Sequence, residues 1–60
     1  MTREKMEQLL RDNWDLVEEV INAHPEDRTA AEHELFASLM LVGILKAEDL
    51  SLFVEVMHDV

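Results

Sequence analysis

Apolar residues recur with helical spacing along the first third of the chain. From Arg3 to Ala23 they fall within an arc of about 160° on a helical wheel, and polar residues fill the opposite side. The apolar arc is made of Met6, Leu9, Leu10, Trp14, Leu16, Val17, Val20 and Ile21. Thr2 precedes the pattern and has the hydroxyl that caps a helix N-terminus. The pattern therefore predicts a helix over residues 3–23.

A short connection is expected after this helix. His24 precedes Pro25, and a residue before proline is pushed away from the helical region, so the first helix should end there. Thr29 and Glu32 then have the spacing of a capping box, in which each side chain bonds a free backbone N–H group near the other. This spacing predicts that the second helix begins at Ala30.

The single glycine, Gly43, marks the expected end of the second helix. Glycine adopts the left-handed conformation that follows many helix C-termini, so we expect helix two over 30–42. A third helix is predicted over 47–59, with apolar residues at the i, i+3, i+4 and i+7 positions Leu50, Phe53, Val54 and Met57. An alternative is one continuous helix over 30–59 with Gly43 inside it. The expectation is an all-α fold with one three-helix domain over 1–60.

The middle helix is apolar on every side. A helix of this kind is normally buried all round, yet in a three-helix domain each helix has only two neighbours. Leaving several Leu or Met side chains in water forgoes roughly 1.5–3 kcal/mol for each, a large share of the stability of so small a domain. We therefore expect a homodimer in which the middle helices pair in a four- or six-helix bundle.

The predicted interface combines the middle helix with apolar residues that lie off the main stripe of the last helix. It consists of Leu35, Phe36, Leu39, Met40, Leu41, Ile44, Leu45, Leu52 and Val56. A monomer that presents one patch of this surface to a different protein is the alternative. The two differ in whether purified protein sediments as a 7.0 kDa particle.

Charge narrows the range of partners. The formal net charge is −9, and residues 12–60 contain 12 acidic side chains against only Arg28 and Lys46. Binding to nucleic acid draws much of its affinity from Lys and Arg that neutralise phosphates, and anionic membranes make the same demand. We therefore expect no nucleic-acid partner and no membrane partner. The apolar fraction of 48% is too high for a disordered acidic tail, so the chain should fold.

No segment has the features of a secretion signal or a membrane span. The N-terminal stretch is polar, and the longest apolar run, from Leu35 to Leu45, is well short of the roughly 20 residues that cross a bilayer. There are no cysteines, so disulfides and thiolate zinc sites are absent. These features predict a cytoplasmic protein.

The residues with catalytic or metal-binding chemistry form no convincing site. Glu55 and His58 have the E-x-x-H spacing of di-iron bundles, but those sites need a second such pair. His24 and His33 have acidic neighbours but lie at helix boundaries, without an apolar pocket to shift a pKa. A catalytic triad and a phosphate-binding glycine loop are also absent. The sequence predicts no enzyme, no cofactor and no metal.

Two further features have more than one interpretation. The segment around Gly43 resembles a helix-turn-helix in outline, but its second helix begins Ala47-Glu48-Asp49 and offers nothing to DNA phosphates. Asn13 falls inside the apolar arc of the first helix, where a buried amide can fix helix register. The alternative for Asn13 is a recognition role beside Trp14.

The leading hypothesis is a non-enzymatic interaction or regulatory protein that acts as an acidic helical homodimer. The alternative is an acidic inhibitor that mimics nucleic acid and occupies the nucleic-acid-binding site of a basic protein. Its acidic surface is formed by Asp12, Asp15, Glu18, Glu19, Glu26 and Asp27. Binding to a basic partner should weaken steeply with salt, whereas an apolar contact should change little.

Overall fold

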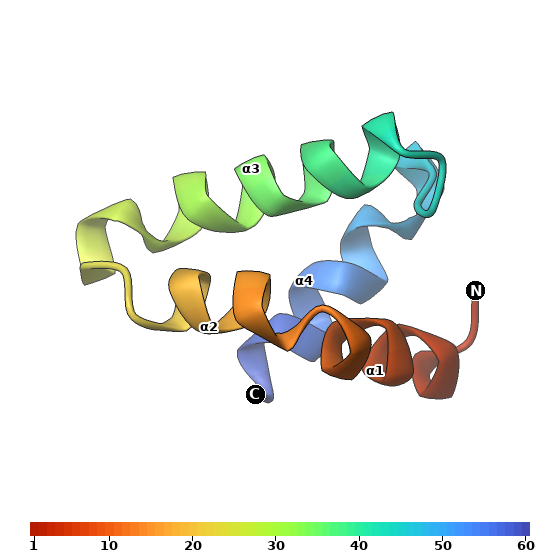
Figure 1. Cartoon of the computed structure of the whole chain (residues 1–60), viewed down its shortest axis with the longest axis horizontal. Coiled ribbons are helices and arrows are strands. Elements are labelled where there is room, and N and C mark those ends of the chain that lie inside the picture. The colour runs from red at the N-terminus through yellow and green to blue at the C-terminus, as the bar shows by residue number, and fades with distance from the viewer.

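The computed structural model describes all 60 residues and contains only helices and connecting turns (Figure 1). The helices are α1 (Arg3–Asp12), α2 (Trp14–Ile21), α3 (Arg28–Leu41) and α4 (Leu50–His58), with short 3-10 helices η1 (Pro25–Asp27) and η2 (Ala47–Asp49). The all-α prediction is confirmed. The predicted number of three helices is wrong, because the first one is divided into α1 and α2.

The division lies at Asn13. Its backbone leaves the helical region, with φ −115° and ψ 34°, and its side-chain Nδ2 donates to the Leu9 carbonyl at 2.9 Å. Asparagine offers the backbone such local bonds as an alternative to a regular helix. The Asn13 carbonyl then accepts the N–H groups of Leu16 and Val17, which starts α2. As a result α1 packs against α4 while α2 packs against α3.

Thr2 caps α1 as expected, since its hydroxyl accepts the Lys5 N–H at 3.2 Å. The predicted start of the next helix is wrong by two residues. The η1 turn leads directly into α3 at Arg28, so Thr29 already lies inside the helix and makes no cap. Glu32 therefore takes no part in a capping box. Its carboxylate accepts a hydrogen bond from Arg28 Nε at 2.7 Å instead.

The end of α3 follows the prediction closely. Gly43 has φ +81°, its N–H donates to the Met40 carbonyl, and the Ile44 N–H reaches back to the Leu39 carbonyl. This pair of bonds is the Schellman motif, which closes a helix with a left-handed residue. The chain then enters η2, so residues 30–59 do not form one continuous helix.

Gly43→Ala should destabilise the domain by about 1–2 kcal/mol, because an L-residue is strained in the left-handed region. A Cβ placed at Gly43 meets nothing within 4 Å, so the cost is purely conformational. Urea denaturation followed by circular dichroism measures the change. Gly43→Asn is the matched control and should lose less, since asparagine tolerates this conformation better. Equal losses in the two variants would contradict this explanation.

The core draws on all four helices. Eleven apolar side chains are buried together, and Phe53, Met6, Met57 and Val17 are the most enclosed. The rings of Phe36 and Phe53 lie 5.3 Å apart and tilted by 58°, a favourable aromatic arrangement. In Figure 1, α3 runs antiparallel to α2, and α4 descends between α3 and α1.

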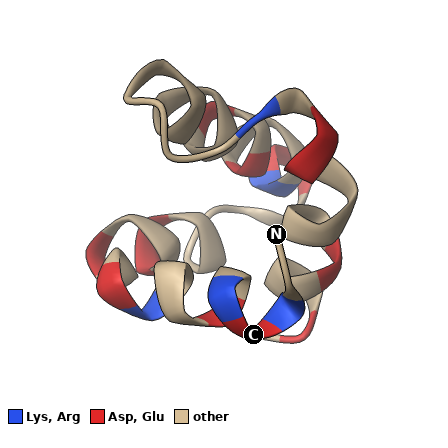
Figure 2. Ribbon diagram, turned by 90° about the vertical axis from the view of Figure 1, so that its right-hand side faces the viewer, with Lys and Arg blue, Asp and Glu red and all other residues tan.

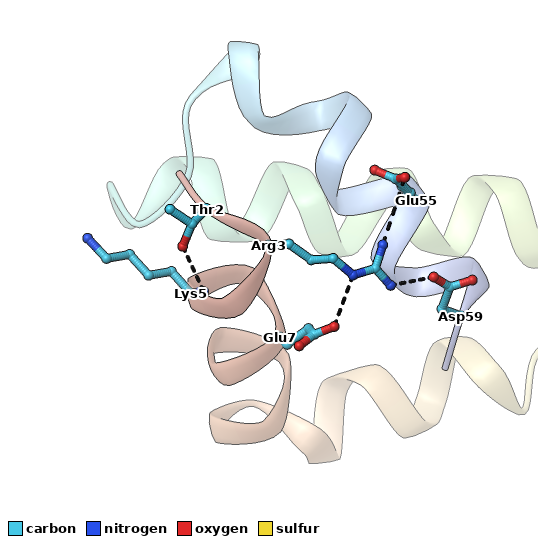
Figure 3. Close-up of polar contacts among 6 residues, drawn as sticks. All are labelled: Thr2, Arg3, Lys5, Glu7, Glu55 and Asp59. Atoms are coloured by element: carbon cyan, nitrogen blue, oxygen red, sulfur yellow. Dashed lines mark hydrogen bonds and ion pairs between the residues drawn. The ribbon is translucent and has the colours of Figure 1, made fainter.

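Two arginines join helices that are distant in sequence. Arg3 of α1 pairs with Glu7 on its own helix, with Glu55 of α4 and with Asp59, the residue that follows α4 (Figure 3). Arg3 donates hydrogen bonds to Asp59 and to Glu7, and these two bonds, the one to Asp59 first, raise the pKa of its guanidinium above the ordinary value. Arg28 of α3 likewise donates from Nη2 to the Met57 carbonyl of α4 at 3.1 Å. The termini of α1 and α3 are thereby held against the last turn of α4.

Candidate functional site

The structure divides the predicted interface into two groups. Leu35, Phe36, Leu39, Leu45 and Val56 are buried in the core of the chain itself. One side of α3 is covered by α2 and α4, and that side takes up most of its large apolar residues. Of the others, Leu52 is half-buried, while Met40, Leu41 and Ile44 are exposed.

The exposed group forms an apolar tip, which we define as Met40, Leu41, Val42 and Ile44. It comprises the last turn of α3 and the turn around Gly43. Leu41 is 89% exposed and Val42 is 69% exposed, the two highest values among the large apolar side chains. Val42 was missing from the predicted interface, although it adjoins Leu41 in the sequence. The left-handed conformation of Gly43 turns the chain here, and Leu41 and Val42 are left mostly exposed.

The acidic residues predicted to form a surface are all exposed, and no Lys, Arg or His forms an ion pair with any of them. They lie at the end of α1, along α2 and in η1. Figure 2 shows that acidic residues outnumber basic ones across that view of the helices. Exposed carboxylates without a cation partner attract basic groups of other molecules.

A groove runs between α2 and α3, and we call it the α2/α3 groove. It encloses about 200 Å³ and is lined by Leu16, Glu19, Val20, Ala31, Glu34, Leu35 and Ser38. A second groove of about 240 Å³ lies between α1 and the end of α4, beside the exposed Trp14. Both are smaller than the roughly 300–1,000 Å³ of typical small-molecule sites. Sequence periodicity gave no signal for either, because each groove depends on how two helices meet.

The rim charges of the two grooves differ. The Trp14 groove has Arg3 and Arg11 together with Glu7 and Asp59, so its charges are mixed. The α2/α3 groove has carboxylates and no basic side chain. The two grooves therefore present different charges to the solvent.

The residues with candidate chemistry do not converge. Glu55 reaches Arg3, at 3.8 Å, whereas the His58 Nε2 lies 3.7 Å from Glu32, so the E-x-x-H pair is directed to separate partners. His24 and His33 are exposed. The structure contains no group of three or more His, Asp or Glu side chains placed to hold a metal ion.

One polar cluster was missed by the sequence reasoning. Glu32 is 3% exposed and is held by Arg28, with His58 of α4 nearby. The i,i+4 spacing of Arg28 and Glu32 was the available signal. Its burial was not visible in the sequence, because it depends on the position of α4.

None of the helices combines the length and apolar character needed to cross a membrane. No protein-family model, no curated protein and no solved structure matches this chain.

Proposed function

We propose that this chain is a non-enzymatic interaction protein that associates with a second copy of itself through the apolar tip. The observation that carries the proposal is the exposure of Leu41 and Val42, at 89% and 69%. Burying such a side chain fully is worth about 1.5–3 kcal/mol, and contact between two tips recovers part of this energy. A two-fold axis through the tip brings the same residues of both copies together.

The distribution of charge supports contact at this place. Two molecules with a formal net charge of −9 repel each other over most of their surfaces. The segment from Leu35 to Leu45 contains no charged residue, so the tip is where two copies approach with the least like-charge contact. A standard interface buries about 800 Å² on each partner, more than four side chains supply. We therefore expect a weak, concentration-dependent dimer.

Sedimentation equilibrium tests the proposal. The wild-type chain should shift from 7.0 kDa toward twice that mass as its concentration rises. Added salt should not weaken this association, because it screens the repulsion between the two acidic chains. The double variant Leu41→Ser, Val42→Ser should remain at the monomer mass. It should also retain the wild-type urea midpoint at low protein concentration, because both side chains are mostly exposed in the monomer.

A matched control changes an apolar side chain outside the tip. Val60 is 49% exposed at the C-terminus, and Val60→Ser should associate like the wild-type chain. Monomeric wild-type protein up to millimolar concentration would refute self-association. Equal loss of association in the Val60 variant would place the contact elsewhere.

A second candidate function is inhibition of a basic nucleic-acid-binding protein. It is favoured by the exposed, unpaired carboxylates of α2 and η1, which present negative charge without a neutralising cation. Binding of this kind weakens steeply between low and high ionic strength. Its salt response thus separates it from association through the tip.

A further inference from the structure

The α2/α3 groove has an apolar floor and one exposed apolar wall. Val20 and Leu35 are buried at its base and Ala31 is half-buried, whereas Leu16 is 41% exposed beside them. An exposed leucine next to a buried apolar floor gives a partner side chain something to pack against on several sides. The groove, at about 200 Å³, suits a few apolar side chains of a larger partner better than a free cofactor.

Carboxylates line this groove from both of its helices. Glu19 lies on α2 and Glu34 on α3, and neither forms an ion pair within the chain. Asp15 is one turn from Glu19 on the same side of α2 and is also exposed. No Lys or Arg lines the groove. The site thus combines apolar contact with a demand for positive charge.

We infer that the α2/α3 groove binds a basic amphipathic helix of another protein, with apolar side chains on the floor and Lys or Arg beside Glu19 and Glu34. An amphipathic helix can place its apolar face in an apolar groove between two helices. A helix with apolar anchors at i, i+3, i+4 and i+7 is a common ligand of such grooves. Strand addition is ruled out here, since both walls are helices without a free sheet edge.

A second copy of this chain does not meet the same demand. It has only five basic side chains, and Arg3 and Arg28 already pair with carboxylates of their own chain. A nucleic acid would meet like charge at the rim. The groove therefore selects a basic protein segment. This inference concerns a surface other than the apolar tip, although Ser38 at one end of the groove is one helical turn from Leu41.

The test uses a fluorescein-labelled synthetic peptide of about 14 residues, with Leu at i, i+3, i+4 and i+7 and Lys on its other face. Fluorescence anisotropy should show saturable binding to the wild-type protein. The variant Glu19→Lys, Glu34→Lys should bind about tenfold more weakly, as expected when two charge pairs become repulsive. Leu16→Ser should also weaken binding.

Matched variants control for net charge and for loss of an exposed leucine. Glu4→Lys with Glu48→Lys makes the same change in net charge at exposed positions outside the groove, and Leu50 is 37% exposed on α4. The charge control and Leu50→Ser should both retain wild-type affinity for the peptide. Circular dichroism of every variant verifies that it is folded.

Three results would overturn the inference. Equal weakening in the two charge-reversed variants would show long-range attraction without a site. Equal binding of a peptide with the same composition but scrambled order would show that the groove does not recognise the apolar face of a helix. Loss of binding in the Leu41→Ser, Val42→Ser variant would place the peptide at the apolar tip, whereas retained binding there separates the groove from self-association.

Discussion

Phe53→Ala is expected to leave the chain largely unfolded at room temperature. Phe53 has no exposed surface, and its ring contacts that of Phe36 at 5.3 Å between centroids. Truncating a buried phenylalanine to alanine typically costs about 3–5 kcal/mol. A single core in a domain of this size rarely supplies more than about 3–5 kcal/mol in total. The helical signal at 222 nm and the urea unfolding curve measure the loss.

Phe53→Leu is the control for this variant, because it keeps most of the apolar volume. It should remain folded, with a loss of about 1.5 kcal/mol or less and a cooperative transition. Both variants should be compared at one low protein concentration, since association stabilises the folded state by mass action. A folded Phe53→Ala protein with the wild-type midpoint would show that the core is not organised around the Phe36–Phe53 pair.

The second large effect is expected at Glu32. Its carboxylate is buried and accepts from Arg28 Nε at 2.7 Å, so Glu32→Ala leaves the half-buried guanidinium without its counter-charge. Breaking a fully buried pair costs about 3–5 kcal/mol, and the remaining exposure of Arg28 reduces this to roughly 2–3 kcal/mol. The free energy of unfolding in urea, measured at neutral pH, gives the value.

A double replacement distinguishes the effect of an unpaired buried charge from the effect of losing the whole ion pair. Arg28→Met with Glu32→Leu removes both charges and replaces them with apolar side chains of similar volume. This double variant should therefore be less destabilised than Glu32→Ala alone. The Met57 carbonyl, which accepts from Arg28 Nη2 in the native chain, lies at the end of α4. The single variants Arg28→Met and Glu32→Leu complete the comparison. If the double variant loses as much stability as these two together, the two residues do not act as a pair.

The sequence predicted helix ends well where a single residue controls the local backbone conformation. Thr2 caps α1, Pro25 follows the end of the N-terminal helical region, and Gly43 closes α3. Each acts through its own hydroxyl, ring or lack of a side chain, so its effect is visible without tertiary information. Asn13 was different, because its apolar surroundings suggested a continuous helix. Instead, the helix is divided at Asn13, where the side-chain amide donates a hydrogen bond to the Leu9 carbonyl.

The candidate surfaces were predicted only in part. Helical spacing shows that apolar residues from Leu35 to Leu45 fall on every side of the helix, but it does not show which side is covered. Leu39 and Leu41 are equally apolar in the sequence, yet one is 3% exposed and the other 89%. The difference comes from the placement of α2 and α4 against α3. The two grooves were not predicted at all, since their walls come from helices distant in sequence.

The sequence by itself determined the helical class, the acidic surface and the ends of the helices at Thr2 and Gly43, because these depend on local bonding and side-chain chemistry. Only the tertiary structure decided which apolar residues form the core, which form the tip, and that Glu32 is buried against Arg28. The physical reason is that a residue becomes buried only when a second surface packs against it. A single helix has a pattern of apolar residues, but its neighbours determine which of them lose contact with water.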